Sequence, residues 1–253
     1  VAPKDDAPSW RLPANVRHLP LIAVGPNLIE RVLSFRAQLT PYLQQQRYDV
    51  AHVRSIYEGL PVALNKHMCC DRLIVEVNGL PSIELKYHYP DVAEDQELLR
   101  KLCWQESQLL SAADLVLTVS DVNASHLRSR GVDSNRISVI PNGVDCERFP
   151  YQAPRRWPLD HVRMLYSGTL SPWQGVGQAI AALALYRRDY SAELHLAGES
   201  RPRQATELSL LCHQLGVAVH VHFHGAVAQH ELARLHHQSD VALAPLRGND
   251  RNR

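Results

Sequence analysis

The sequence predicts an α/β protein of two parallel-sheet domains, each of them incomplete. Short apolar runs with strand character alternate along the chain with segments of helical periodicity. This alternation is typical of parallel sheets joined by right-handed crossover helices that cover both faces. The alternation of strands and helices is interrupted at 145–160, an irregular segment with three prolines and two adjacent arginines. The chain opens on Pro-rich coil without an initiator Met and stops just past a strand, so we expect it to be internal to a longer protein.

The first predicted domain spans residues 1–144. Its clearest strand is RLIVEV, which ends at the turn signal Asn78–Gly79 and is followed by a long polar loop. We expect Pro61 to open a short helix, Ser120 to cap another and Gly131 to close it. The expected strands are 48–53, 72–77, 114–119 and 136–140, and the other expected helices are 27–46, 60–67 and 91–112.

The second predicted domain spans 161–253 and follows the linker 145–160. Its expected strands are 162–167, 192–197, 217–223 and 240–244, and its expected helices are 175–188, 203–215 and 229–238. Ligands of open parallel sheets bind beyond the carboxyl ends of the strands. The loops after these strands are therefore where we expect the function to lie.

The composition is that of an ordinary soluble globular protein, with 45% apolar and 21% charged residues. The formal net charge of +1 gives no electrostatic reason to expect a nucleic-acid partner. No apolar run approaches the length of a membrane span. The five cysteines show no zinc or redox spacing, which favours reduced structural thiols in a cytoplasmic protein.

The loop SGTLSPWQG, residues 167–175, lies between a predicted strand and a predicted helix. Gly168 allows a sharp turn, and Gly175 opens a helix whose free N–H groups form an anion site. The hydroxyl of Thr169 and the amide of Gln174 add donors. This arrangement suits a diphosphate, and the alternative is a tight turn without a ligand.

Three blocks of sequence carry a resemblance to a known family. They are ADLVLTVS with RGVDSNRISVIPNGVDCERF, then LYSGTLSPWQGV, then HLAGES with VHFHGAV and QSDVALAPL. In order and spacing the chain resembles the retaining glycosyltransferases of family four, also called glycosyl transferases group 1. The resemblance implies the GT-B arrangement, in which two Rossmann-like domains face each other across a cleft. The second domain then binds a nucleotide sugar and the first domain binds the acceptor.

Residue by residue, the resemblance implies two groups of donor contacts. The donor diphosphate would lie over Gly168, Thr169, Gln174 and Gly175. The nucleoside would lie near Gly198, Glu199, Gly225 and Val227. Preorganised donors at the phosphates stabilise the charge that develops on the leaving diphosphate, so the chemistry needs no metal. We therefore expect no metal and no cofactor other than the nucleotide-sugar donor.

The chain departs from the family pattern at several positions. Many members place an Arg and a Lys where this chain has Thr169 and Gln174, and a His near the transferred sugar where this chain has Asn78. Asn78 is thus the candidate catalytic residue, and Arg54 and Glu84 are candidate acceptor contacts. The family's Gly-rich first loop and its later glutamate pair are absent from this chain, so we expect the fragment itself to be inactive.

His220, His222 and His224 alternate, so on a strand they would share one face and could bind a transition metal. No carboxylate or cysteine completes the set at a telling spacing. The family resemblance also explains this segment as scaffold of the nucleotide-binding domain. Scaffold is therefore the preferred interpretation.

The sequence predicts a hexosyltransferase that acts with retention on a nucleoside-diphosphate sugar and a glycan or lipid-linked acceptor in polysaccharide assembly. The alternatives are a non-catalytic nucleotide-sugar-binding fragment and a sugar-nucleotide epimerase on the same fold. A Rossmann oxidoreductase would need a GxGxxG turn, and the chain has none. We expect a cytoplasmic location, and Arg155–Arg156 would allow a weak contact with the inner face of the membrane.

Overall fold

The computed structural model describes residues 13–151, 153, 155, 157, 159–246 and 248. The predicted N-terminal coil at 1–6 and Arg156 of the linker lie outside these residues. The chain divides into two compact units, Val1–Asn142 and Gly143–Arg253. Each unit contains one four-stranded parallel sheet, so the predicted fold class is confirmed.

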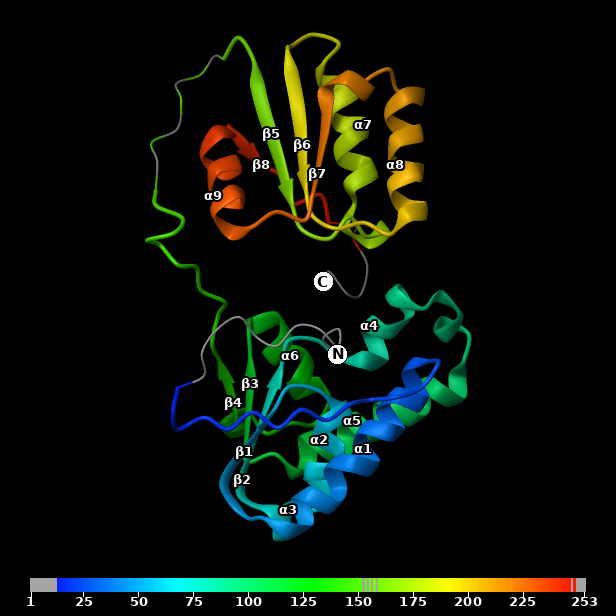
Figure 1. Ribbon diagram of the computed structural model, residues 1–253, viewed down its shortest axis with the longest axis vertical. Helices are drawn as coiled ribbons and strands as arrows, with labels where there is room; N and C mark the ends of the chain where they lie inside the picture. Colours follow the sequence, from blue (N-terminus) through cyan, green and yellow to red (C-terminus); the bar gives the residue numbers. More distant parts are fainter. Residues whose placement is uncertain are drawn as a thin grey trace. The chain divides into compact units, whose positions relative to one another are not determined.

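The sheet of the first unit has the strand order β1-β2-β3-β4, and every pair is parallel. The carboxyl ends of all four strands therefore meet at one edge. Its elements are β1 (Tyr48–Val53), β2 (Cys70–Val77), β3 (Leu115–Thr118), β4 (Ile137–Val139), α1 (Leu28–Gln45), α2 (Ile56–Leu64), α3 (Lys66–Cys69), α4 (Pro81–His88), α5 (Gln96–Ala112), α6 (Asp121–Ser129) and the short 3-10 helices Pro90–Ala93 and Ser134–Arg136. Helix α2 packs between α1 and α5 (Figure 1). The core is apolar, with Leu73, Val116 and Leu109 among its fully buried members.

Helix α2 begins four residues earlier than the sequence predicts, at Ile56 rather than at 60. Ser55 and Glu58 form a capping box, in which the Ser55 hydroxyl accepts from the amide of Tyr57. Pro61 lies inside the helix instead of opening it. A proline cannot donate to the carbonyl four residues back, and here Arg36 Nε donates to that carbonyl, Tyr57 O, at 2.9 Å.

The prediction of a long loop after β2 is also wrong, because most of that segment is helical. Pro81 stands in the first turn of α4, where its missing N–H leaves no bond unmade. Helix α5 then begins at Gln96 rather than at 91, because the Asp95 side chain accepts from the amide of Leu98 and caps it. The start and end signals at Ser120 and Gly131 are confirmed, with Gly131 at a φ of +88°.

The sheet of the second unit has the strand order β7-β6-β5-β8, and its strands are parallel. Strands β6 and β7 therefore extend the sheet on one side of β5, and β8 lies on the other side. Helices α7 and α8 cover one face and α9 covers the other (Figure 1). The elements are β5 (Val162–Ser167), β6 (Ala192–Ala197), β7 (Val221–Gly225), β8 (Val241–Ala242), α7 (Val176–Tyr186), α8 (Pro202–Gln214), α9 (Gln229–Gln238) and the 3-10 helices Pro172–Gln174 and Ala218–His220. Strand β7 begins at Val221, later than predicted, because Ala218–His220 forms a 3-10 turn. Among the described residues, no helix combines the length and apolar composition needed to cross a membrane.

Candidate functional site

Three glycines lie side by side where β5, β6 and β7 end, and we call Gly168, Gly198 and Gly225 the glycine edge. The amide of Gly198 donates to the carbonyl of Gly225 at 2.8 Å, and the amide of Gly168 donates to the carbonyl of Ala197 at 2.9 Å. A Cβ on Gly198 would lie 1.8 Å from the carbonyl oxygen of Gly168. Gly198 has a φ of +155° as well, so both its conformation and its neighbour require glycine.

The loop after β5 is anchored by its own side chains and backbone. Leu170 is buried, and its amide donates to the carbonyl of Glu199 at 2.9 Å. The Tyr166 hydroxyl donates to the carbonyl of Thr169 at 2.8 Å. Gly168 and Thr169 remain exposed between these anchors. The loop therefore presents backbone to solvent in a fixed orientation.

Helix α7 starts directly after this loop. Gly175 has a φ of +75°, and its carbonyl accepts from the amides of Gln178 and Ala179 at 2.9 and 3.2 Å. The amides of Val176 and Gly177 are then the first-turn donors that a helix cannot satisfy by its own bonds. Such donors, with the positive end of the helix dipole, make a site for an anion.

A close contact joins this helix start to the loop after β8. A Cβ on Gly175 would lie 1.7 Å from the carbonyl oxygen of Pro245. Strands β5 and β8 are neighbours in the sheet although the chain runs from β5 to β6, so this is the point where the strand order reverses. Open α/β sheets bind ligands beyond the strand ends at such a reversal.

The structure brings all eight predicted donor-site residues to this edge of the second sheet. Four belong to the loop and helix start, three to the ends of β6 and β7, and Val227 follows β7. They are Gly168, Thr169, Gln174, Gly175, Gly198, Glu199, Gly225 and Val227. Val227 is partly buried and packs against the cluster of Leu165, Ala197 and Leu235.

The candidate residues of the first unit gather at the carboxyl edge of its sheet. Glu76 accepts from Asn78 Nδ2 at 3.0 Å and from Arg54 Nε at 3.1 Å, and it lies 3.3 Å from Nε2 of His52. The hydrogen bond from Asn78, followed by the charges of Arg54 and His52, lowers the pKa of Glu76. This carboxylate is the centre of the cluster.

Glu84 approaches the same edge from helix α4. Its carboxylate packs against Gly79, where an added Cβ would lie 2.4 Å from Glu84 Oε1. The structure therefore places Arg54, Asn78 and Glu84, the three predicted residues of this unit, at one end of the sheet, with Glu76 and His52 beside them.

The expected row of three histidines on one strand is only partly correct. His220 belongs to a 3-10 turn, whereas His222 and His224 lie on β7. They flank His195 of β6, with ring centroids at 4.7 and 5.2 Å from it. The carboxylate that the sequence did not reveal comes from the neighbouring strand, at Glu193.

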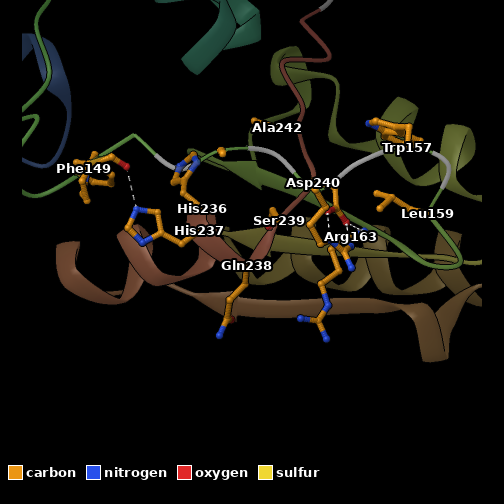
Figure 2. A pocket seen from close by; sticks show the side chains of 13 residues that line it. Phe149, Trp157, Leu159, Arg163, His236, His237, Gln238, Ser239, Asp240 and Ala242 are labelled. Carbon is orange, nitrogen blue, oxygen red and sulfur yellow. Dashed lines mark hydrogen bonds and ion pairs between the residues drawn. The ribbon is translucent and has the colours of Figure 1, made fainter.

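A cavity of about 600 Å³ lies apart from these groups, between the linker and the start of β8. Asp240 and Arg163 are among the residues that line it (Figure 2). Arg155 donates through Nε to Asp240 at 2.7 Å, and Asp240 also accepts from the amide of Arg163 at 2.8 Å. The hydrogen bond from Arg155 is the main reason that the pKa of Asp240 is lowered. This pairing attaches the linker to the second sheet, and the charge of Arg155 is neutralised by Asp240.

Two parallel-sheet units, one with a glycine-lined strand edge beside a helix start, define a protein of the GT-B fold. The Glycosyltransferase Family 4 model matches residues 1–148, and the Glycosyl transferases group 1 model matches residues 148–248. The chain therefore belongs to glycosyltransferase family 4.

Curated relatives share part of this chain. The D-inositol 3-phosphate glycosyltransferase of Xylanimonas cellulosilytica is 29% identical over 153 residues, which cover 55% of this chain and 37% of the relative. The glycogen synthase of Mycobacterium tuberculosis is 33% identical over 152 residues, or 58% of this chain and 36% of the relative. The aligned part of the chain thus spans little more than a third of these relatives.

Solved structures share the fold. Sucrose-phosphate synthase from Thermosynechococcus elongatus has a TM-score of 0.70 at 22% identity, over 91% of this chain and 61% of that protein. Anabaena HepE in complex with UDP-glucose has a TM-score of 0.60 at 19% identity, over 83% of this chain and 56% of that protein.

Proposed function

We propose that this chain is part of a glycosyltransferase that transfers a hexosyl unit with retention from a nucleoside-diphosphate sugar to a glycan or lipid-linked acceptor. The observation that carries the proposal is the glycine edge together with the start of α7. At this edge Gly198 leaves no room for a side chain, so a ligand meets backbone. The neighbouring helix start supplies the partial positive charge that a diphosphate requires.

The donor site works by holding the leaving group. As the bond between the sugar and the diphosphate breaks, negative charge grows on the diphosphate oxygens. In this proposal the amides of Val176 and Gly177 donate to those oxygens, together with the hydroxyl of Thr169 and the side-chain amide of Gln174. The Leu170 side chain is buried and the Thr169 carbonyl accepts from the Tyr166 hydroxyl, so both anchors of the loop are already formed. The loop therefore needs little reorganisation when the charge develops on the diphosphate.

The nucleoside lies over the ends of β6 and β7 in this proposal. Gly198 and Gly225 allow the ring to approach the backbone, and Glu199 is exposed next to them. Relatives support a nucleotide donor, because HepE was solved with UDP-glucose and one relative is named as a GDP-mannose-dependent mannosyltransferase of Mycobacterium tuberculosis.

The acceptor side is assigned to the cluster around Glu76. Arg54 and Asn78 orient the carboxylate by their hydrogen bonds to it. In this proposal Asn78 is the residue of the first unit that contacts the transferred sugar. Relatives whose names include inositol phosphate and phosphatidylinositol mannoside support a polar glycan or lipid-linked acceptor. A cytoplasmic site of action and an inactive isolated fragment remain predictions from the sequence.

Calorimetric titration with UDP, GDP and ADP tests the donor site. We expect one of the three to bind with a 1:1 stoichiometry. Thr169→Val should weaken that binding about fivefold to tenfold, the loss expected for one hydrogen bond to a charged group. Thr206→Val is the matched control, since Thr206 is exposed on α8 and bonds within its own helix. A folded chain that binds none of the three nucleotides would contradict the proposal.

A further inference from the structure

A compact cluster of metal-ligating side chains lies on one face of the second sheet, about three residues before the ends of β6 and β7. Glu193 and His195 are two residues apart on β6 and therefore share a face, and His222 is the register partner of His195 on β7. Their side chains are 19%, 19% and 43% exposed. The cluster lies on the face opposite Leu194 and Leu196, which are fully buried in the core under α7 and α8.

The ligand atoms converge on one point. Nε2 of His195 lies 3.2 Å from Oε1 of Glu193, and Nε2 of His222 lies 3.4 Å from Oε2. All three ligand atoms lie within 4.8 Å of one another. Bonds of about 2.0–2.2 Å, as zinc makes to His and carboxylate, put the corners of a tetrahedron about 3.3–3.6 Å apart. The two distances from histidine to carboxylate are close to this spacing, each to its own carboxylate oxygen, and the limit of 4.8 Å for the whole set exceeds it by little more than 1 Å.

His195 has the hydrogen-bonding pattern of a metal ligand. Its Nδ1 lies 2.9 Å from Nε2 of His224, so this pair shares a hydrogen bond. Its Nε2 is buried and makes no hydrogen bond within the described part of the chain, although Glu193 is beside it. Ligating histidines bond through one ring nitrogen while the other nitrogen is fixed by a neighbouring group. His224 is that neighbour here.

The carboxylate of Glu193 is held in place by a hydrogen bond from Arg163 Nε at 2.8 Å. Arg163 bonds Oε1, which leaves Oε2 directed toward His222.

We propose that Glu193, His195 and His222 bind a transition-metal ion, with Zn²⁺ the best fit and His224 as a positioning residue. Two imidazoles and one carboxylate are a zinc ligand set, and a water molecule completes the tetrahedron. The ion would link β6 to β7, the edge strand of the sheet, close to the strand ends that carry Gly198 and Gly225. Its role is then to stabilise the β6–β7 pair, separately from the binding of a nucleotide.

Titration of the tag-free, EDTA-treated chain with Co²⁺ and with Zn²⁺ tests this site. We expect one saturable site per chain, a visible absorption band of four-coordinate Co²⁺ that Zn²⁺ abolishes, and a melting temperature that rises with Zn²⁺. Affinity should fall as the pH is lowered, because a histidine must lose its proton before it binds a metal.

Variants identify the ligands. His222→Gln should weaken Co²⁺ binding at least a hundredfold. His222 is exposed, so we expect the variant to fold like the wild type, and circular dichroism checks this. His224→Gln should weaken binding about tenfold, as expected when the partner of a ligating histidine is removed. His213→Gln is the matched control, because His213 is exposed on α8, and its affinity should equal that of the wild type.

Two results would overturn the proposal. One is non-saturating binding spread over several weak sites, which would indicate adventitious contacts among the fourteen histidines. The other is a folded His222→Gln variant that binds Co²⁺ as tightly as the His213→Gln control. In that case Glu193 serves only as the ion-pair partner of Arg163 and its neighbouring histidines.

Discussion

The position that a Cβ would occupy on Gly198 lies 1.8 Å from the carbonyl oxygen of Gly168. This contact joins the loop after β6 to the loop after β5, at the place where the donor diphosphate and nucleoside are proposed to meet. No rotation of a side chain can relieve it, because both partners are backbone. The closeness of the two loops is therefore tied to glycine at position 198.

Gly198→Ala should lower both stability and nucleotide affinity. The methyl group forces the two loops apart, and we expect a loss of roughly 2–4 kcal/mol in the free energy of unfolding. Nucleotide affinity should fall at least tenfold, measured by calorimetry. Gly216→Ala is the control, since Gly216 has a φ of +67° but nothing within 4 Å of an added Cβ. It should cost only about 1 kcal/mol and leave nucleotide affinity unchanged. Equal losses in the two variants would show that backbone conformation, and not the Gly168 contact, matters at 198.

Arg36→Ala should destabilise the first unit. Arg36 donates to the carbonyls of Ile56 and Tyr57 at 2.6 and 2.9 Å and to Oε1 of Gln105 at 2.8 Å. The Tyr57 carbonyl has no helical donor because Pro61 stands four residues on. We expect a loss of roughly 2–3 kcal/mol in urea unfolding, since half-buried acceptors are left unmatched. Arg100→Ala, which removes a bond within α5, should change stability by less than about 0.5 kcal/mol.

The same arginine explains why one helix start could not be predicted. From the sequence, Pro61 marks a helix start, because proline is tolerated in the first turn and disrupts a helix interior. The donor that makes Pro61 tolerable comes from α1, twenty-five residues earlier, and no local pattern reveals it. The strands β1, β5 and β6 were predicted from their local apolar patterns, and their predicted limits agree with the structure.

The place of the candidate donor residues in the fold could be predicted from the sequence, because most of them lie at or directly after the end of a strand. The family resemblance named the individual residues, and their role as a donor site stays a prediction. The histidine cluster differs, because Glu193 and His222 are far apart in the chain and become neighbours only through the β6–β7 register. The sequence showed the alternating histidines of this segment, but it did not show that Glu193 of β6 lies beside them.

Glu106→Ala should be among the most destabilising changes in the first unit. The Glu106 side chain is fully buried, and it accepts from the amide and hydroxyl of Ser82 at 2.8 and 2.7 Å and from Arg130 at 3.1 Å. It thereby links the first turn of α4 to the end of α6. Removing it leaves partly buried donors and the charge of Arg130 unmatched, so we expect a loss of about 3–5 kcal/mol in urea unfolding.

A matched variant separates the buried position from the charge itself. Glu97 lies on the same helix, but its side chain is 70% exposed and, within the described part of the chain, pairs only with Lys101. Glu97→Ala should cost less than about 1 kcal/mol. A loss below 1 kcal/mol for Glu106→Ala as well would contradict a structural role for this carboxylate.

The acid stability of the second unit should depend on Glu193. The pKa of Glu193 is lowered in the folded chain to about 2, from an ordinary value of 4.5. A carboxyl group with a lowered folded pKa adds stability above its unfolded pKa, and this contribution is lost as the pH falls through the folded value. In EDTA, the free energy that Glu193 contributes should therefore be constant above about pH 4.5 and vanish near pH 2.

Unfolding curves of the wild type and Glu193→Gln should differ by about 1–2 kcal/mol at pH 7, once solvent screening is allowed for, and converge toward pH 2. Glu207→Gln, which removes an exposed carboxylate paired with Arg203 on α8, should follow the wild type throughout. A gap between wild type and Glu193→Gln that stays the same from pH 7 to pH 2 would mean that the shape of the side chain, and not its charge, stabilises the β6–β7 face.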